Sequence, residues 1–471
     1  MNTTSTTTRE RMIAANQAEY GEHAQALRWV NTTQATAAET RRAETLATLA
    51  ERITQACKQT KPHYGPLSPG CQICTQGQWS CLFINGRCNC RCFYCPTAQD
   101  DTGVPTTNLI QFATPEAYAE YASRFGFSGV SISGGEPLLT YERAIAYLQA
   151  VRHKMGTEPH LWLYTNGTLV TAERLAGLKA AGLDEIRFDI SAVDYSLEKA
   201  RLAADHIACV TVEIPAIPED AQRLADLLPA LSDAGVRHLN LHQLRLTPHN
   251  RPNLIQRNYT YLHGESVTVL ESELTALALL QRACDQRLPL AVNYCSFVYK
   301  RRYQKAAARR RSAQESLKAH EAVTENGFIR TLALTGEPER IGLQAEHLKR
   351  CGLPPDRWTL NAKHDRLGFH PELWPQLDLS AGRLTIGYAE AVLSAQVSYR
   401  CAFKEVRLTP ADKLYIEKRP LRLELPLDES DRDYFRRAVI EASPVPKTPQ
   451  SPAQEEIADF EFIRPGLQDY F

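Results

Sequence analysis

The stretch that decides the fold is "CNCRCFYCP", residues 88–96, which places four cysteines within eight positions. Cys88, Cys92 and Cys95 have the spacing C-x3-C-x2-C, and Cys90 is left over. An ordinary electron-transfer iron–sulfur cluster is closed by four cysteines, so three thiolates leave one iron of a four-iron cluster open. The spacing therefore predicts a cluster that can bind a further ligand.

A structural zinc knot or a chance crowding of thiols is the alternative. Zinc sites usually pair two C-x2-C hooks or add histidines at set spacing, and His63 is the only histidine between residues 60 and 100. The motif follows the strand-like "LFING", residues 82–86, and so lies on a loop at the carboxyl end of a strand. Folds built from βα units place their chemistry there, which favours the open cluster.

Seven short strand-like segments alternate with helical stretches between residues 80 and 295. The segments are "SCLFING" (80–86), "GVSISGG" (129–135), "HLWLYTNG" (160–167), "EIRFDIS" (185–191), "CVTVEIPAI" (209–217), "HLNLHQL" (238–244) and "PLAVNYC" (289–295). This alternation predicts βα units, a parallel sheet and right-handed crossovers. We therefore predict an α/β fold with a partial (βα)6 barrel.

The composition divides the chain into four regions. Residues 1–62 have apolar positions at helical spacing and predict an N-terminal helical region. The barrel and its cysteine-rich entry segment cover residues 63–311. Residues 320–441 contain strand-like segments without the βα alternation and predict a small α+β domain. Residues 442–471 include "SPVPKTPQSP" and predict a proline-rich linker and a tail.

The charge balance and the cysteine usage limit the functional classes. Lys plus Arg equals Asp plus Glu at 54 each, so no general attraction to nucleic acid or to anionic membranes is expected. No apolar run is long enough to cross a bilayer, and "MNTTSTTTRE" has no signal-peptide core. We therefore expect a cytoplasmic protein. Eight of its thirteen cysteines lie between Cys57 and Cys95, and clustered thiols in a reducing compartment indicate a metal site.

The second strand-like segment ends in "SISGGEP", residues 131–137. Gly134 and Gly135 let the backbone approach a ligand closely. Glu136 adds a carboxylate at the same mouth of the barrel, where it could hold an ammonium group. These residues indicate a cofactor pocket beside the cysteine loop.

With both motifs in place, the chain resembles the radical S-adenosylmethionine enzymes over about residues 80–300. Within them it resembles a group related to pyruvate formate-lyase activating enzyme. This resemblance rests on "GCQICTQGQWSCLFINGRCNCRCFYCP" (70–96), "ISGGEPLL" (132–139), "LYTNG" (163–167) and "LDEIRFDIS" (183–191). It implies a 4Fe-4S cluster on Cys88, Cys92 and Cys95, whose open iron chelates S-adenosylmethionine. Cys90 departs from the usual pattern and is expected to be a non-ligand.

The resemblance also implies a reaction. One electron from a low-potential donor of the flavodoxin or ferredoxin type would cleave the sulfonium, and the 5'-deoxyadenosyl radical would abstract a hydrogen atom from a substrate. That substrate, a protein, a peptide or a small molecule, is not identified by the sequence. The alternative function is an iron–sulfur electron-transfer or scaffold protein without radical chemistry. A mere electron carrier needs no cofactor pocket, so the GGEP motif speaks against this alternative.

By analogy with the family, several residues are assigned to the cofactor. Glu136, in the turn with Gly134, Gly135 and Pro137, would bind the methionine amino group. Asp189 and Ser191 would bind the ribose or the methionine carboxylate. The backbone of Tyr94 would contact the adenine, and Asn166 would join this cofactor-binding set.

Side-chain alternation along the strands supports a ligand-filled barrel independently. In "IRFDIS" the apolar residues 186, 188 and 190 face one way, and Arg187, Asp189 and Ser191 face the other. The same parity places further polar residues on the inner face, and we expect these to meet the substrate: Glu213, Asn240, His242 and Asn293. A purely structural barrel core would hold branched apolar residues instead. The alternative for any one of them is a core polar group bonded within the protein.

A second group of cysteines lies upstream in the pattern C-x2-C-x6-C: Cys71, Cys74 and Cys81. One interpretation is an auxiliary iron–sulfur cluster, with Cys57, Cys90 or a distant cysteine as the fourth ligand. The other is a structural zinc or core thiols. Since Cys81 begins the first strand and Cys88 follows it, an auxiliary centre is expected at the bottom of the barrel, up to roughly 20 Å from the mouth.

The stretch "KRRYQKAAARRR", residues 300–311, carries seven positive charges. We expect it to be a solvated helix face. The alternative is a contact with an anionic substrate or with nucleic acid just beyond the last strand.

Overall fold

The computed structural model describes residues 8–443 and 449–471. The described chain divides into two compact units. The first unit holds the residues up to Gln304 together with Pro465–Phe471, and the second holds Lys305–Arg464. The boundary at Gln304 comes shortly before the predicted end of the barrel at residue 311.

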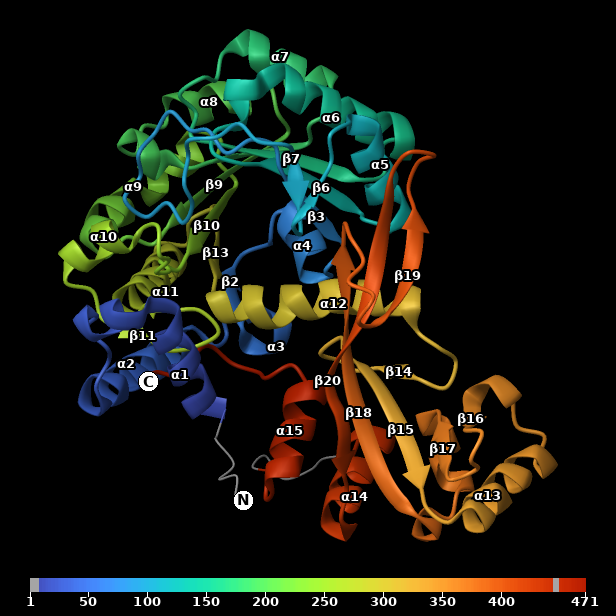
Figure 1. The fold of residues 1–471 in the computed structure, drawn as a ribbon. Coiled ribbons are helices and arrows are strands. Elements are labelled where there is room, and N and C mark those ends of the chain that lie inside the picture. Colours follow the sequence, from blue (N-terminus) through green and yellow to red (C-terminus); the bar gives the residue numbers. More distant parts are fainter. Residues whose placement is uncertain (1–7, 444–448) are drawn as a thin grey trace. The chain divides into compact units, whose positions relative to one another are not determined.

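The first unit is built on a curved sheet whose seven central strands are parallel, in the order β13-β10-β9-β8-β7-β6-β3 (Figure 1). These strands are β3 (Trp79–Phe83), β6 (Gly129–Ser133), β7 (His160–Thr165), β8 (Glu185–Phe188), β9 (Cys209–Pro215), β10 (His238–His242) and β13 (Ala291–Cys295). The helices between them are α5 (Pro115–Arg124), α6 (Tyr141–Met155), α7 (Ala172–Ala180), α8 (Glu198–Ala204), α9 (Ala221–Asp233) and α11 (Leu270–Asp285). The prediction of an α/β fold with six βα units is confirmed, and a seventh parallel strand follows them.

Four short elements lead the chain from one edge of this sheet into the interior of the barrel. They are β1 (Thr54–Gln55), α3 (Ala56–Gln59), β2 (Lys61–Tyr64) and α4 (Pro69–Thr75). β2 pairs antiparallel with β13, and α4 contacts β3, β6 and β7. A Cβ atom on Gly70 would lie only 2.4 Å from the Arg187 guanidinium and 3.3 Å from the Trp162 ring. Because both side chains face the concave side of the sheet, α4 lies inside the lumen (Figure 1).

The N-terminal helices are part of the first unit. They are α1 (Thr8–Tyr20), a 3-10 turn (Gly21–Ala26) and α2 (Thr32–Leu49). Tyr20 and Leu27 are buried in one cluster with Leu244, Tyr261 and Val269, which lie in or beside β11 (Tyr261–Leu262) and β12 (Thr268–Val269). The region predicted to be helical therefore packs on the barrel. At the far edge of the sheet lie β4 (Thr106–Thr107) and β5 (Ile110–Gln111), and α10 (Arg251–Leu254) follows β10.

The second unit is an antiparallel sheet covered by helices, in the order β16-β17-β15-β18-β20-β19 with β14 beside β15. Its strands are β14 (Ala322–Val323), β15 (Ile329–Thr335), β16 (Trp358–Leu360), β17 (Arg366–Phe369), β18 (Arg383–Ser394), β19 (Ala402–Arg407) and β20 (Lys413–Pro426). Its helices are α12 (Lys305–Ser316), α13 (Pro338–Arg350), α14 (Glu429–Phe435) and α15 (Pro452–Glu461). The strand β18 runs without a break over twelve residues.

The predicted tail belongs to both units. Ile457 of α15 is fully buried in the core of the second unit. Farther along, Gln468 accepts a hydrogen bond from the Thr268 hydroxyl at 2.8 Å and donates one to the His263 carbonyl at 2.7 Å. The Tyr470 hydroxyl donates to Glu273 at 2.5 Å. Residues 452–471 are therefore integral to the fold, whereas residues 444–448 of the predicted linker lie outside the described part.

The basic stretch 300–311 is not a solvated face, and this prediction is wrong. Of its seven cations only Lys305 is exposed. Arg302 pairs with Glu265 at 2.6 Å, and the Arg310 guanidinium donates to a backbone carbonyl at 2.7 Å. Most of these charged side chains donate hydrogen bonds to acceptors within the protein. Helical periodicity alone does not reveal such contacts. No helix among residues 8–443 and 449–471 has the length and apolar character needed to cross a bilayer.

One buried histidine beside the returning tail makes the stability of the first unit pH-dependent. His263 is 6% exposed, and its ring stacks on Trp29 with centroids 3.7 Å apart. Burial, with a contribution from Arg9, lowers the pKa of His263 to about 4. The unfolded chain takes up this proton near pH 6.5. Stability is therefore full above pH 6.5 and falls as the pH drops toward 4, by about 1 kcal/mol at pH 5.5.

We expect the melting temperature of the wild type to fall more between pH 7.5 and pH 5.5 than that of His263→Phe. Phenylalanine keeps a ring against Trp29 but cannot be protonated. Circular dichroism melts at the two pH values measure the difference. Equal pH dependence in both proteins would contradict the prediction.

Candidate active site

The cysteine loop follows β3 at the carboxyl ends of the parallel strands, where the sequence places it. Its four thiols are neither fully buried nor fully exposed. The Cys88 sulfur accepts hydrogen bonds from the Cys90 amide at 3.4 Å and from Asn166 Nδ2 at 3.7 Å. The Cys95 sulfur accepts one from Gln99 Nε2 at 3.0 Å. N–H groups directed at sulfur tune iron–sulfur clusters, so these contacts suit cluster ligands.

The GGEP turn packs against the cysteine loop through its two glycines. A Cβ on Gly134 would lie 2.4 Å from the Asn85 carbonyl oxygen, and one on Gly135 would lie 2.1 Å from that of Arg87. The Gly135 and Glu136 amides donate to these same two carbonyls at 2.9 and 2.7 Å. Gly134 and Gly135 therefore make the close approach that was predicted, and they make it to the backbone that carries the cysteines.

Glu136 has no solvent exposure. Its carboxylate accepts hydrogen bonds from the Leu138 amide at 2.9 Å, the Thr165 hydroxyl at 2.9 Å and the Asn166 amide at 2.7 Å. Burial raises the pKa of Glu136, and these bonds offset part of the increase. Three of about four acceptor positions are taken, so the side chain joins the turn after β6 to the end of β7. Pro137 is buried and begins the 3-10 turn Pro137–Thr140.

Tyr94, Asp189 and Ser191 meet at the mouth of the barrel. The Tyr94 hydroxyl donates to Asp189 Oδ2 at 2.9 Å, and the Ser191 hydroxyl donates to Asp189 Oδ1 at 2.5 Å. Burial, the charge of Asp189 and the Cys92 thiol raise the pKa of Tyr94 well above its usual value. Tyr94 therefore remains a hydrogen-bond donor. The structure brings three predicted cofactor residues together beside Cys92, a predicted cluster ligand.

Two further side chains hold the far end of the cysteine loop. Asn250 is 1% exposed, and its amide donates to the Tyr94 carbonyl at 3.0 Å. The Thr247 hydroxyl donates to the Pro96 carbonyl at 3.1 Å. The backbone of Tyr94, expected to contact adenine, thus has a protein partner. Sequence reasoning missed both residues, because "TPHN" marks only a turn and gives no sign of its distant partner.

The inner face of the barrel is polar, as the strand parity predicts. The Arg187 guanidinium donates to Glu185 at 2.8 Å and to Glu213 at 2.7 Å, and it lies 5.0 Å from the Trp162 ring centroid. Burial alone would raise the pKa of Glu185, but Arg187 and His160 hold it at about 2. Arg187 therefore stabilises two buried carboxylates at once.

The four residues expected to meet the substrate form one network. Glu213 accepts hydrogen bonds from Asn240 at 3.0 Å and from His242 Nε2 at 2.6 Å, and Asn293 donates to the Asn240 side chain at 3.0 Å. Lys300, which was not predicted for the site, lies 2.8 Å from His242 Nδ1. Since an ammonium group only donates, Nδ1 accepts and the Nε2 hydrogen points at Glu213. These groups are largely bonded to one another, as core polar groups are.

The upstream cysteines separate into two environments. Cys71 accepts a hydrogen bond from Asn240 at 3.3 Å, and Cys74 accepts one from Gln304 at 2.7 Å. Burial raises the pKa of Cys81, which the Ser131 and Ser133 hydroxyls partly offset. The structure thus brings Cys71 and Cys74 together toward the β10 and β13 side of the lumen, with Cys81 on β3.

No three Cys, His, Asp or Glu side chains in the described part of the chain converge on a point that could hold one metal ion. The thiols of Cys88, Cys92 and Cys95 nevertheless fit a four-iron cluster, because each ligand of such a cluster binds a different iron. The thiol of Cys88 is close enough to the thiols of Cys92 and Cys95 to interact electrostatically with both. Three thiols from one loop, with N–H donors directed at two of them, are the donor set that such a cluster needs.

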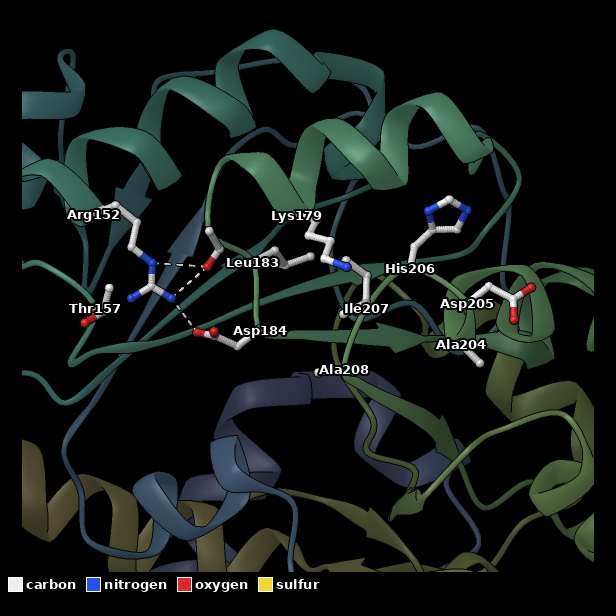
Figure 2. Close-up of a pocket in the computed structure, with 11 residues that line it drawn as sticks. Arg152, Thr157, Lys179, Leu183, Asp184, Ala204, Asp205, His206, Ile207 and Ala208 are labelled. Atoms are coloured by element: carbon white, nitrogen blue, oxygen red, sulfur yellow. Dashed lines mark hydrogen bonds and ion pairs between the residues drawn. The ribbon is translucent and has the colours of Figure 1, made fainter.

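A surface hollow lies away from the cysteine loop (Figure 2). Its walls include Asp184 before β8 and Ile207 before β9, at the amino ends of the strands. Arg152 on its rim donates to the Gly182 carbonyl at 2.7 Å and pairs with Asp184 at 2.5 Å. Barrels of this kind place their chemistry at the opposite end, so the hollow is not the candidate site.

Comparison with known proteins finds several that this chain resembles. Residues 82–208 match the family model of the Radical SAM superfamily. A Methanocaldococcus jannaschii protein, provisionally named a glycyl-radical enzyme activating enzyme, is 31% identical over 284 residues, which are 58% of this chain and 74% of that protein. A GTP 3',8-cyclase of Corynebacterium glutamicum is 33% identical over 156 residues, 32% of this chain and 40% of that protein. Among solved structures, Streptococcus suis SuiB bound to S-adenosylmethionine has a TM-score of 0.35 and 10% identity, over 64% of this chain and 67% of that chain.

Proposed function

Because the chain belongs to the radical SAM superfamily, whose cofactors are a 4Fe-4S cluster and S-adenosylmethionine, we propose that it cleaves S-adenosylmethionine reductively and uses the 5'-deoxyadenosyl radical to abstract a hydrogen atom. The observation that carries the proposal is the loop after β3. There the thiols of Cys88, Cys92 and Cys95 stand at the mouth of the barrel. The GGEP turn packs directly against them.

Cys88, Cys92 and Cys95 would each hold one iron, and the open iron would take the amino and carboxylate groups of methionine. Glu136 has about one acceptor position left for the methionine ammonium. Asp189 suits the ribose hydroxyls, which are donors, better than the methionine carboxylate, whose like charge it would repel. Cys90 supplies its backbone N–H to the Cys88 sulfur, and its own thiol is not a ligand.

For the substrate we favour a protein or peptide segment that enters at the mouth. The lower lumen is occupied by α4, whose Gly70 lies against Arg187 and Trp162, which leaves little room for an enclosed small molecule. His242, with 21% side-chain exposure, is more accessible than Arg187 and Glu213, and is the group that a substrate can reach. The name of the M. jannaschii relative points to the same substrate class.

A low-potential flavodoxin or ferredoxin would supply the electron, and the compartment would be the cytoplasm. Each of the thirteen cysteines is a free thiol, which is typical of a reducing environment.

The test is anaerobic incubation of the cluster-loaded, reduced protein with S-adenosylmethionine. The proposal expects 5'-deoxyadenosine, and expects deuterium to enter it when deuterated protein fractions of the producing cells are added. If loaded and reduced protein forms no 5'-deoxyadenosine, the proposal fails and the electron-transfer alternative stands. Deuterium from small metabolites but not from proteins would overturn the choice of substrate class alone.

Two lumen residues should separate cofactor binding from substrate turnover. Asp189 bonds Tyr94 beside the cluster ligands, whereas His242 lies two strands farther round on β10. Removing a charged hydrogen bond costs about 1.5–3 kcal/mol, so Asp189→Ala should weaken S-adenosylmethionine binding roughly tenfold or more. His242→Ala should leave that affinity and substrate-free cleavage nearly unchanged. Anaerobic titration of both variants decides this, and equal losses of affinity would contradict the assignment.

A further inference from the structure

Four thiols surround one buried lysine on the side of the lumen away from the cysteine loop. Lys61, the first residue of β2, is 1% exposed, and its ammonium lies 4.2 Å from the Tyr299 ring centroid. No carboxylate pairs with Lys61 in the part of the chain that the structure describes. Its acidic neighbours are four thiols: those of Cys295, Cys71, Cys74 and Cys57.

The backbone explains why these four cysteines meet. Cys71 and Cys74 are three residues apart on α4 and so share one face of the helix. In the β2–β13 ladder His63 pairs with Asn293 and Tyr64 with Val292. Continuing this antiparallel register places Lys61 opposite Cys295. The three elements α4, β2 and β13 therefore direct their cysteines and their lysine to one place.

Cys57 reaches the same place from a turn of unusual conformation. Cys57, Lys58 and Gln59 are three consecutive non-glycine residues with φ of 54°, 53° and 65°. Left-handed non-glycine residues are strained and persist only where the surrounding structure holds them. Here the Thr60 hydroxyl donates to the Cys57 carbonyl at 2.7 Å, and the Ser296 hydroxyl donates to the Thr60 carbonyl at 2.6 Å. The turn is thus anchored to the end of β13, beside Cys295.

Polar donors are also directed at two of the four sulfur atoms. Asn240 donates to Cys71 at 3.3 Å and Gln304 donates to Cys74 at 2.7 Å, with the Tyr299 hydroxyl 3.1 Å from Cys74. Free thiols in a core usually pack as small apolar groups. Amide and hydroxyl donors directed at sulfur are instead the surroundings of an iron–sulfur cluster.

A buried ammonium without an opposite charge is strongly disfavoured, and in the described part of the chain these thiols are the acidic groups placed to compensate Lys61. We propose that Cys57, Cys71, Cys74 and Cys295 hold a second iron–sulfur cluster of four irons, with Lys61 as its charge partner. Four thiolates close such a cluster, so it transfers or stores electrons and does not bind substrate. Cleavage of S-adenosylmethionine does not require this site, which therefore goes beyond the proposed function.

The amide donors directed at Cys71 and Cys74 favour a cluster over a single zinc ion. A zinc ion with Zn–S bonds of about 2.3 Å would instead hold its thiolates within about 4 Å of one another. The ligand set also differs from the sequence pattern. Cys295 replaces Cys81, which lies on β3 with its thiol against Ser131 and Ser133 of β6. Cys90 lies in the cysteine loop at the mouth of the barrel.

The test removes the first cluster before the second is counted, so that the two proposals fail separately. A full-length variant with Cys88, Cys92 and Cys95 all changed to Ala is reconstituted anaerobically with iron and sulfide. It should bind about four irons and four sulfides and give a reduced-cluster EPR signal. Adding Cys295→Ala or Cys57→Ala should remove most of this iron, whereas Cys81→Ala should leave it. Loss of iron with Cys81→Ala but not with either of the others, or one zinc in place of iron, would overturn the proposal.

The role of Lys61 has its own readout. Lys61→Met keeps the length of the side chain and removes the charge, so the second cluster should stay loaded but titrate at a more negative potential. Lys58→Met removes an exposed charge nearby and is the matched control. Redox titration of the EPR signal measures both. An unchanged potential in Lys61→Met would show that Lys61 is not the charge partner.

Discussion

Alanine at Cys88, Cys92 or Cys95 is expected to abolish cleavage of S-adenosylmethionine, whereas Cys90→Ala is expected to retain it. Each of the three ligands would hold its own iron, and without one of them the cluster loses an attachment to the protein and no longer has a single defined open iron. The loss should exceed about 100-fold, since even groups that only support a metal ligand are worth about 10–100-fold. Cys90 lies between two ligands on the same loop, which makes Cys90→Ala a closely matched control.

Two measurements check this outcome. Anaerobic 5'-deoxyadenosine formation gives the activity, and the EPR spectrum of the reduced protein, with and without S-adenosylmethionine, reports whether the cofactor binds the cluster. Cys90→Ala should show the same spectral change as the wild type. If Cys90→Ala loses both signals while Cys88→Ala keeps them, the ligand assignment is wrong.

Arg187→Leu is expected to cost about 3–5 kcal/mol of stability. Arg187 has 4% side-chain exposure and holds Glu185, which has none, and Glu213, which has 10%. Leucine would leave two buried carboxylates without their cation. At roughly 1.5 °C for each kcal/mol in a unit of about 310 residues, the melting temperature should fall by roughly 5–8 °C.

A triple variant separates charge from packing. Arg187→Leu combined with Glu185→Gln and Glu213→Gln removes the uncompensated charges and should recover most of the lost melting temperature. Thermal melts of the wild type, the single variant and the triple variant give the answer. A triple variant as unstable as the single one would mean that the guanidinium acts through its packing on Trp162 and Tyr164.

The sequence was sufficient for the features that local patterns determine. Strand positions and the inward parity of Arg187, Glu213 and Asn240 follow from side-chain alternation, because a strand that is one residue out of register would bury the wrong face. The location of the cysteine loop follows from the strand that precedes it. For the glycines of GGEP the partner could not be predicted. Their flexibility is visible in the sequence, but the carbonyls of Asn85 and Arg87 that require it are not.

What the sequence could not supply are contacts between distant segments. Cys295 follows Lys61 by more than 200 residues, and only the pairing of β2 with β13 reveals that they are close. Lys61 carries no sign of burial, since a lone lysine is normally exposed. The prediction that residues 300–311 form a solvated helix face failed for the same reason. Helical periodicity does not show that Lys300 contacts His242 or that Arg302 pairs with Glu265.

The return of Pro465–Phe471 to the first unit has a consequence for how the protein is made. Gln468 and Tyr470 bond Thr268 and Glu273, but the 160 residues from Lys305 to Arg464 are synthesised between these partners. At about 5–20 residues per second, the ribosome needs roughly 8–32 s to make them. Throughout that interval the surface that receives Tyr470 stays uncovered. The cysteines of the candidate metal sites have by then been translated, so their iron can arrive before the first unit is complete.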